Sequence, residues 1–390
     1  MNPTPPCALP PEIISLIIDE FHGNKADLLR CSQVCRTWLP FTRNKLYICL
    51  RKSNIPSFIQ LTASPQTTLI ATIGHLELWS FSDIFSKILP MLSKFTSLRT
   101  LVLSCRIYSE LPLLPFLHEL NLNYTDFPSY ANFTASMLNF AALRSLKLSN
   151  LTWRMGPEDG KFRFPSLDLQ SLHLDWNWHE TAAIAGVVRS VRTRKLIFDP
   201  PIDSEALPDF LSTISQYLRI LGAHLHRLEL DISHISRDDI GSFNFSHCPN
   251  LTHLQLNGTC WLSIHDNPDE CVVGLHSSLI DLLMATKHHA SLRTLVLPII
   301  NCSFNVYVPF ADLADLLETS PFIGLQTVEF TVHDAPVNGS SRLARLKTLV
   351  LSAIPSRDGR QVQRLVAVAG SRRVTVEVSQ NMFFEKQQIF

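Results

Sequence analysis

A recurring leucine pattern constrains the fold of this 390-residue chain more than any other sequence feature. The pattern L-x-x-L-x-L begins at Leu98, Leu117, Leu143, Leu169, Leu225, Leu251 and Leu292. Three of the intervals, 117 to 143, 143 to 169 and 225 to 251, are 26 residues long. Leucines that alternate along a short strand make one apolar face, which a single repeat cannot bury alone. The pattern therefore predicts short parallel strands, stacked over a continuous core and joined by returning helices.

Weaker copies extend this pattern over residues 73–380. They begin at Ile73, Thr193, Leu325 and Leu346, and the last covers 374–378. Apolar residues at helical spacing predict returning helices at 82–89, 209–218 and 312–318. The period and the strand motif resemble leucine-rich repeats, whose period is roughly 20–29 residues, in a degenerate form. The fold class is α/β, a solenoid of parallel short strands with returning helices.

The first fifty residues predict a small helical module instead. After a Pro-rich tail at 1–8, which we expect to be mobile, Ile13, Leu16, Ile17 and Phe21 form an apolar stripe at helical spacing. A second short helix is expected through 28–31 and a third through 34–39. Three short helices cannot bury a sizeable core, so the module needs a partner or a neighbouring domain. We assign it to 9–48, with a linker helix at 49–72 and a C-terminal tail at 381–390.

The same segment resembles the F-box motif. The resemblance lies in the run Leu9-Pro10-Pro11-Glu12-Ile13, then Leu28-Leu29-Arg30, then Val34-Cys35-Arg36-Thr37-Trp38. F-box proteins bind a Skp-type adaptor, which links them to a cullin–RING ubiquitin ligase. The resemblance implies adaptor-binding roles for Leu9, Pro10, Ile13, Leu28, Val34 and Trp38. It implies that Leu9 and Pro10 pack on the adaptor, while Leu28, Val34 and Trp38 hold the helices together and complete the adaptor surface. An ordinary helical cap on the repeat array is the alternative.

The outward strand positions are expected to line a concave face, where leucine-rich-repeat receptors commonly bind a protein. The candidate substrate-binding residues are Glu119, Asn121, Lys147, His173, Asp175, Arg227, Glu229, His253 and Gln255; Thr100, Lys195, Thr294 and Glu329 also point outward. The alternative is a solvated face without a ligand. Trp153 and the pair Trp176 and Trp178 are either interface anchors or residues packed beneath the repeat edge.

Other classes of chemistry find little support. Lys plus Arg and Asp plus Glu are 34 each, so no net charge attracts nucleic acid or an anionic membrane. No apolar run reaches the ~18 residues of a membrane span, and the start does not resemble a secretory signal, so we expect a cytoplasmic or nuclear protein. No phosphate-binding loop, nucleophile elbow or zinc-protease motif occurs, and His247, Cys248, His253, Cys260, His265 and Cys271 lack zinc-site spacing. We expect no enzyme activity, no cofactor and no metal.

These features predict the substrate-recognition subunit of an SCF-type (Skp–cullin–F-box) E3 ubiquitin ligase. The helical module would dock the adaptor and the array would bind a substrate protein. The architecture is similar to that of F-box proteins with degenerate repeats in mushroom-forming fungi. The alternatives are an adaptor-binding interaction protein that supports no degradation and a repeat scaffold with a helical cap.

Overall fold

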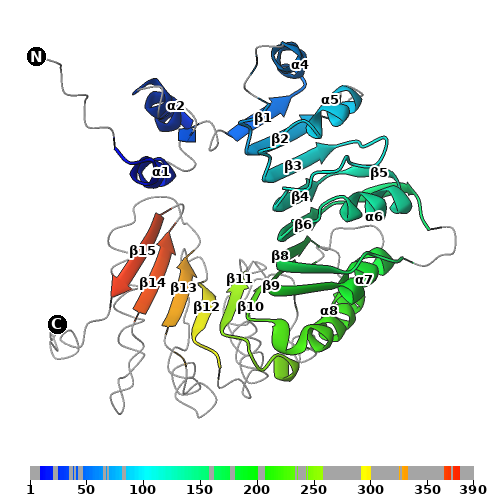
Figure 1. The fold of residues 1–390 in the computed structure, drawn as a ribbon. Helices are drawn as coiled ribbons and strands as arrows, with labels where there is room; N and C mark the ends of the chain where they lie inside the picture. The colour runs from blue at the N-terminus through cyan, green and yellow to red at the C-terminus, as the bar shows by residue number, and fades with distance from the viewer. Residues whose placement is uncertain are drawn as a thin grey trace, which may run out of the picture. The chain divides into compact units, whose positions relative to one another are not determined.

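A computed structural model describes most of the chain between residues 9 and 377. The described residues are 9–20, 25–34, 38, 41–42, 47–64, 67, 70–80, 85–157, 162–175, 181–200, 207–232, 235, 243, 245–257, 291–299, 325, 327–332, 364–369 and 372–377. The chain is mixed α/β, with mostly parallel strand pairing (Figure 1). It divides into two compact units, unit 1 with residues 1–169 and 178–191, and unit 2 with 170–177 and 192–390.

Two helices lead unit 1. α1 spans Pro11–Glu20 and α2 spans Lys25–Val34. Proline is well suited to the first helical position, because an N–H there has no partner within the helix. The Pro10 carbonyl starts α1 by accepting hydrogen bonds from the Ile13 and Ile14 amides at 3.0 and 3.1 Å. Val34 was expected to open a third helix but is the last residue of α2, and 35–37 and 39–40 lie outside the described residues.

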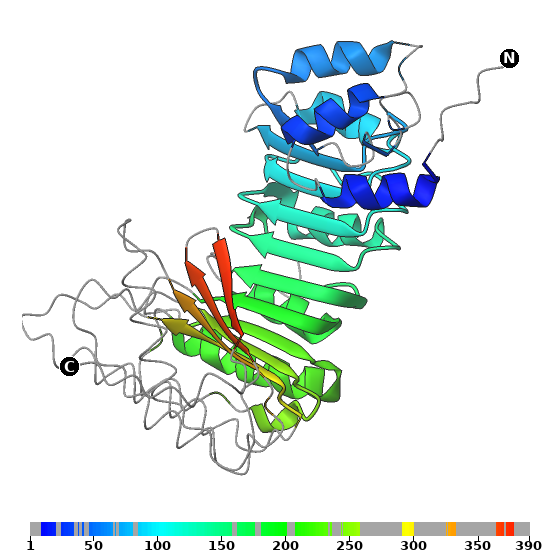
Figure 2. The same cartoon turned by 90° about the vertical axis from the view of Figure 1, so that its left-hand side faces the viewer.

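Five strands of unit 1 pair in parallel in the order β1-β2-β3-β4-β6. Their bounds are Tyr47–Arg51, His75–Ser80, Thr100–Cys105, Glu119–Asn123 and Ser145–Ser149. Figure 2 shows these strands stacked one above another. The register places Leu101 opposite Leu120, and Leu120 opposite Leu146, and all three are buried. The leucine pattern thus forms a continuous apolar row through the unit.

Successive strands also begin alike. The His118 carbonyl accepts hydrogen bonds from the two amides that lead into β6, at 2.8 and 2.9 Å. The His226 carbonyl accepts from the two amides that lead into β11, at 2.9 and 3.1 Å. The turns after β4 and β6 share left-handed backbone at Tyr124 (φ 49°) and Asn150 (φ 50°), which are 26 residues apart. The backbone therefore repeats even where the side chain differs.

The described part of unit 1 contains four further helices, each of which connects one strand to a later one. They are α4 (Ile55–Ala63), α5 (Phe85–Leu92), α6 (Tyr130–Leu138) and α7 (Thr181–Ser190), and α4 to α6 lie on one side of the strands (Figure 1). Ser129 caps α6, where its hydroxyl accepts a hydrogen bond from the Asn132 amide at 3.1 Å. α7 passes so close to Phe162 that a Cβ atom on Gly186 would lie 2.6 Å from the Phe162 carbonyl oxygen.

A second, two-stranded parallel sheet was not predicted from the sequence. β5 (Asp126–Ser129) and β7 (Thr152–Met155) are each too short to show an alternating pattern. An aromatic cluster lies beside them, in which the Phe133 ring is 5.2 Å from Phe127, 5.5 Å from Phe164 and stacked on Trp153 at 6.2 Å between centroids. Trp153 is half-buried in this cluster. Of the two alternatives for this residue, an interface anchor or a packed side chain, the structure shows the packed side chain.

In unit 2 the strand order is β8-β9-β10-β11-β12-β13-β14-β15, and β9 to β14 pair in parallel. The bounds of β8 to β13 are Leu167–Asp175, Val191–Asp199, Arg227–Asp231, His253–Asn257, Thr294–Ile299 and Thr327–Val332, and the unit boundaries fall within β8 and at the start of β9. The expected helix at 209–218 lies within α8 (Leu207–Leu221). Short 3-10 helices follow at Gly222–His224 and Phe245–His247. The Phe198 ring of β9 packs against Phe210 and Tyr217 of α8 at 6.0 and 6.3 Å.

The last strand differs from the prediction of a purely parallel array. β14 (Arg364–Ala369), which the leucine pattern did not predict, is parallel to β13, whereas β15 (Arg372–Glu377) is antiparallel to β14. Only Gly370 and Ser371 separate these two strands. A parallel crossover needs about a dozen or more residues, so this connection permits only antiparallel pairing.

The segment 49–72, which was predicted to be a linker helix, also differs from that prediction. It begins inside β1, which pairs with β2, and among its described residues only those of α4 are helical. The parallel pairing therefore starts about one strand earlier than the leucine pattern indicated. The predicted helix at 312–318, the weak copy at 346–351 and both tails lie outside the described residues.

Candidate functional site

Polar side chains gather on the face of the unit 2 strands that points away from α8. Because Phe198 points toward α8, the residues before and after it in β9 point to the opposite side of the sheet. We call this side the open face. In β9, β10 and β11 it consists of Lys195, Ile197, Asp199, Arg227, Glu229, Asp231, His253, Gln255 and Asn257.

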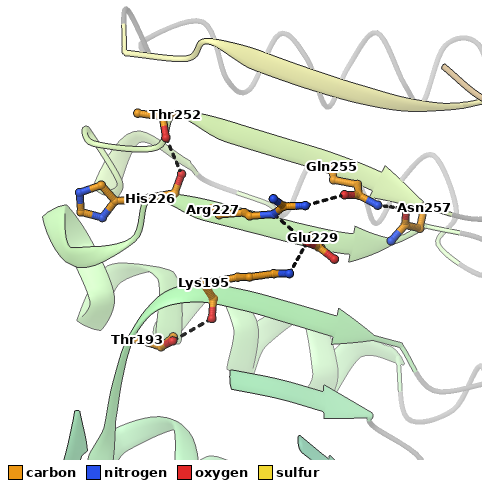
Figure 3. Close-up of polar contacts among 8 residues, drawn as sticks. All are labelled: Thr193, Lys195, His226, Arg227, Glu229, Thr252, Gln255 and Asn257. Carbon is orange, nitrogen blue, oxygen red and sulfur yellow. Dashed lines mark hydrogen bonds and ion pairs between the residues drawn. The ribbon is translucent and has the colours of Figure 1, made fainter. Parts of the chain in front are cut away.

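Glu229 is the central charge of the open face (Figure 3). Its side chain is buried, and its Oε1 atom accepts hydrogen bonds from Lys195 Nζ and Arg227 Nε, both at 2.7 Å. A buried carboxylate is strongly unfavourable unless it is paired and hydrogen-bonded. Lys195 and Arg227 supply this pairing for Glu229, although the three residues come from two strands more than thirty positions apart in sequence.

An amide chain extends this network to the next strand. Arg227 Nη2 donates to Gln255 Oε1 at 3.2 Å, and Gln255 Nε2 donates to Asn257 Oδ1 at 2.8 Å. The direction of these bonds fixes the orientation of the Gln255 amide. The Lys195 and Arg227 side chains keep 32% and 41% of their surface exposed. Two partly exposed cations thus share one buried carboxylate.

A histidine–aspartate contact lies toward the other end of the strands. His173 Nε2 of β8 is 2.6 Å from Asp199 Oδ2 of β9. Asp231 occupies the corresponding end of β10, opposite Asn257 of β11. Asp175 and His253 are half-buried and each takes part in further interactions. The open face therefore carries Lys195 and Arg227 side by side on β9 and β10, and carboxylates at the ends of these strands.

The candidate residues in unit 1 form a sparser set. Glu119 is exposed, and its Oε2 accepts a hydrogen bond from Thr100 Oγ1 at 3.2 Å. Asn121 lies opposite Lys147 in the register, and both are half-buried. Among the predicted substrate-binding residues, the structure brings Arg227, Glu229 and Gln255 together in one hydrogen-bonded network.

The N-terminal helices divide their apolar residues between two surfaces. Ile14 and Ile18 of α1 pack with Leu28 of α2 in a buried cluster, and Trp38 and Phe41 lie against it. Leu9, Ile13 and Leu16 are 46%, 42% and 62% exposed. Because α1 is apolar on both sides, it fills a small core with one face and leaves the other in solvent.

Residues 6–51 match the family model described as F-box-like. The matched segment starts three residues before the module assigned from the sequence and ends three residues after it, so it includes β1. This match supports an F-box role for this end of the chain. F-box domains typically bind Skp-type adaptors. No curated protein matches the chain.

The F-box-like segment places the candidate adaptor residues in different environments. Leu9, Pro10 and Ile13 are exposed at the start of α1. Leu28 is buried, and Trp38 is half-buried against the same cluster. These positions separate residues that are available for contact from residues that hold the helices together.

The sequence analysis missed part of the F-box-like segment and part of the open face. It placed the apolar stripe of the first helix at Ile13, Leu16, Ile17 and Phe21, whereas Ile13 and Leu16 are exposed and the core contains Ile14 and Ile18. It also left out Asp199 and Asn257, which lie two residues after the outward positions Ile197 and Gln255. Asp199 and Asn257 could have been found by extending the alternation of inward and outward side chains to the last residue of each strand.

Within the described ranges, no three His, Cys, Asp or Glu side chains are grouped to hold a metal ion. Cys248, one of the residues considered for zinc, is buried, and its Sγ donates to the Leu218 carbonyl at 3.4 Å. Cys260, His265 and Cys271 lie outside those ranges. Among the described helices, none is both long and apolar enough to cross a membrane.

Proposed function

We propose that this chain is the substrate-recognition subunit of an SCF-type E3 ubiquitin ligase. In this role the F-box-like segment docks a Skp-type adaptor and, through it, a cullin–RING ligase. The rest of the chain, a degenerate leucine-rich-repeat array, holds a substrate protein on its outward strand face. The observation that carries the proposal is the F-box-like match at residues 6–51.

The exposed side of α1 supports adaptor docking. Ile13 and Leu16 are three residues apart in α1, so they lie on one side of the helix, and the exposed Leu9 precedes its first residue. Exposed apolar residues grouped in this way mark a surface for protein contact. The internal cluster around Ile14 and Ile18 would keep this surface in place without the adaptor.

Repeated register supports the array. Leucines at matching strand positions are buried side by side through β3, β4 and β6, and again through β9, β10 and β11. The inward positions supply the core, which leaves the outward positions for recognition. The mixed charges of that face suit a protein partner better than a nucleic acid.

In this proposal the chain supplies no catalytic residue and needs no cofactor. Its contribution is proximity, because holding a substrate beside the ubiquitin-loaded partner raises the effective concentration of the substrate lysine.

The test is co-purification of the full chain with a Skp-type adaptor and a cullin. We expect wild type to retain both, and Leu9→Ala with Pro10→Ala to retain neither. Both side chains are exposed, and an alanine in place of Pro10 keeps the backbone carbonyl that starts α1, so we expect the variant to remain folded. Leu113→Ala is the matched control, since Leu113 is 60% exposed outside the matched segment.

Failure of wild type to bind the adaptor would leave a repeat scaffold with a helical cap and would refute the proposal. Adaptor binding without cullin binding, or without turnover of bound proteins in cells, would identify a non-degradative interaction protein. Loss of binding in Leu113→Ala would show that the assay reports general damage rather than docking.

A further inference from the structure

We propose that the open face of β9, β10 and β11 recognises an acidic side chain of the bound protein, through Lys195 and Arg227. This inference rests on the proposed function only in taking the occupant to be the substrate. It adds that the substrate must present a negatively charged side chain.

The charge balance of the network carries the inference. Lys195 and Arg227 supply two positive charges, and Glu229, which both contact at 2.7 Å, supplies one negative charge. Within these three residues one positive charge is therefore left over, and both cations are partly exposed. A single carboxylate from a partner neutralises it.

The unused donors lie on the same two side chains. A lysine ammonium has three N–H donors and a guanidinium has five. Within the described part of the chain, Lys195 Nζ contacts only Glu229, and Arg227 uses Nε and Nη2. The remaining donors of Lys195 and those of Arg227 Nη1 are available to a carboxylate, for which a guanidinium edge has matching geometry.

The strand ends exclude a polyanion as the occupant. Asp199 lies four residues beyond Lys195 on the same face, and Asp231 lies four residues beyond Arg227, which corresponds to about 13 Å along a strand. A second negative charge at that distance would therefore lie beside a carboxylate rather than beside a further cation of β9 or β10. The face therefore suits a protein segment with one acidic side chain and a neutral or basic residue further along, rather than a nucleic acid.

The probe is a phage-displayed library of random peptides, selected on the immobilised full-length chain. We expect the selected peptides to be enriched in Asp or Glu at one position relative to the unselected library. The affinity of one selected peptide is then measured by fluorescence anisotropy against variants of the network.

Two variants shift the surplus charge in opposite directions without leaving Glu229 unpaired. Lys195→Gln keeps the Arg227–Glu229 pair and lowers the surplus from one to zero, so we expect affinity to fall about fivefold, as for a partly exposed ion pair. Glu229→Gln raises the surplus to two, so we expect affinity to rise. Arg194→Gln is the matched control, because Arg194 adjoins Lys195 but points to the other side of β9 and is exposed.

The inference is overturned if wild type selects no peptides, or selects peptides with no acidic preference. It is also overturned if Lys195→Gln and Glu229→Gln change affinity in the same direction, or if Arg194→Gln weakens binding as much as Lys195→Gln. Adaptor co-purification reports the proposed function separately, since none of these substitutions touches the F-box-like segment.

Discussion

Burial of single residues sets the chemistry of two cysteines. Burial raises the pKa of the Cys248 thiol from 9.0 to about 12, and raises the pKa of Cys105 well above its usual range. Both thiols belong to the core, so the folded state favours their neutral form. The stability that this contributes is fully present below pH 9 and is lost as the pH rises from 9 toward 12.

We therefore expect Cys105 and Cys248 to resist iodoacetamide at pH 8, because alkylation requires an accessible thiolate. Cys31 and Cys49, which are only half-buried, should react faster than these two. The measurement is the modified fraction of each cysteine against time by peptide mass spectrometry. Equal rates for Cys31 and Cys248 in the folded protein would contradict the prediction.

The aromatic cluster beside α6 gives a second prediction at this scale. Phe133→Ala removes a fully buried ring that contacts Phe127, Trp153 and Phe164. We expect the free energy of unfolding to fall by about 3–5 kcal/mol, as for other buried aromatic truncations. Urea denaturation measures it, with Leu138→Ala in the same helix as control, since Leu138 is 70% exposed and should cost less than about 0.5 kcal/mol.

At the scale of elements, the direction of a side chain decides its use. α1 places Ile14 and Ile18 in a core and leaves Leu16 in solvent, within one apolar run. β10 buries Leu228 and Leu230 against neighbouring leucines and places Arg227 and Glu229 on the open face. In both elements composition alone does not separate structural from contact residues, whereas helical or strand periodicity combined with packing does.

α7 gives a prediction about helix packing. Gly186→Ala should gain about 1 kcal/mol in helix propensity but brings a Cβ atom to 2.6 Å from the Phe162 carbonyl oxygen. Because backbone must move to relieve that contact, we expect a net loss of about 1–3 kcal/mol, measured as a lower denaturation midpoint. Gly156→Ala is the control, since its Cβ meets nothing within 4 Å. A more stable Gly186→Ala protein would show that α7 is free to shift.

At the scale of the whole molecule, charge and exposed apolar surface point to a protein that works in a complex. Charged residues are 17% of the chain and the formal net charge is zero, so little repulsion opposes self-association. The exposed leucine and isoleucine side chains of α1 add a contiguous apolar patch.

We expect co-expression with a Skp-type adaptor to raise the fraction of the chain that elutes as a single species in size-exclusion chromatography. Covering the exposed face of α1 is the physical reason, so Leu9→Ala with Pro10→Ala should lose most of that gain. An equal monodisperse fraction with and without the adaptor would indicate that this face does not limit solubility.

The sequence by itself determined the periodic part of this protein. Leucines at alternating positions required short strands with one buried face, and the apolar spacing at 209–218 required a helix, because both patterns are local. The order of F-box-like residues was likewise readable along the chain, and the family match covers the same segment.

Only the tertiary structure decided the features that depend on distant residues. β1 has few leucines and is a strand because β2 pairs with it, while β5 and β7 are too short to carry a pattern. Glu229 was expected on the surface, yet it is buried because Lys195, thirty-four residues earlier, lies beside it. Charge pairing across strands depends on register, and register is set by how the whole sheet packs.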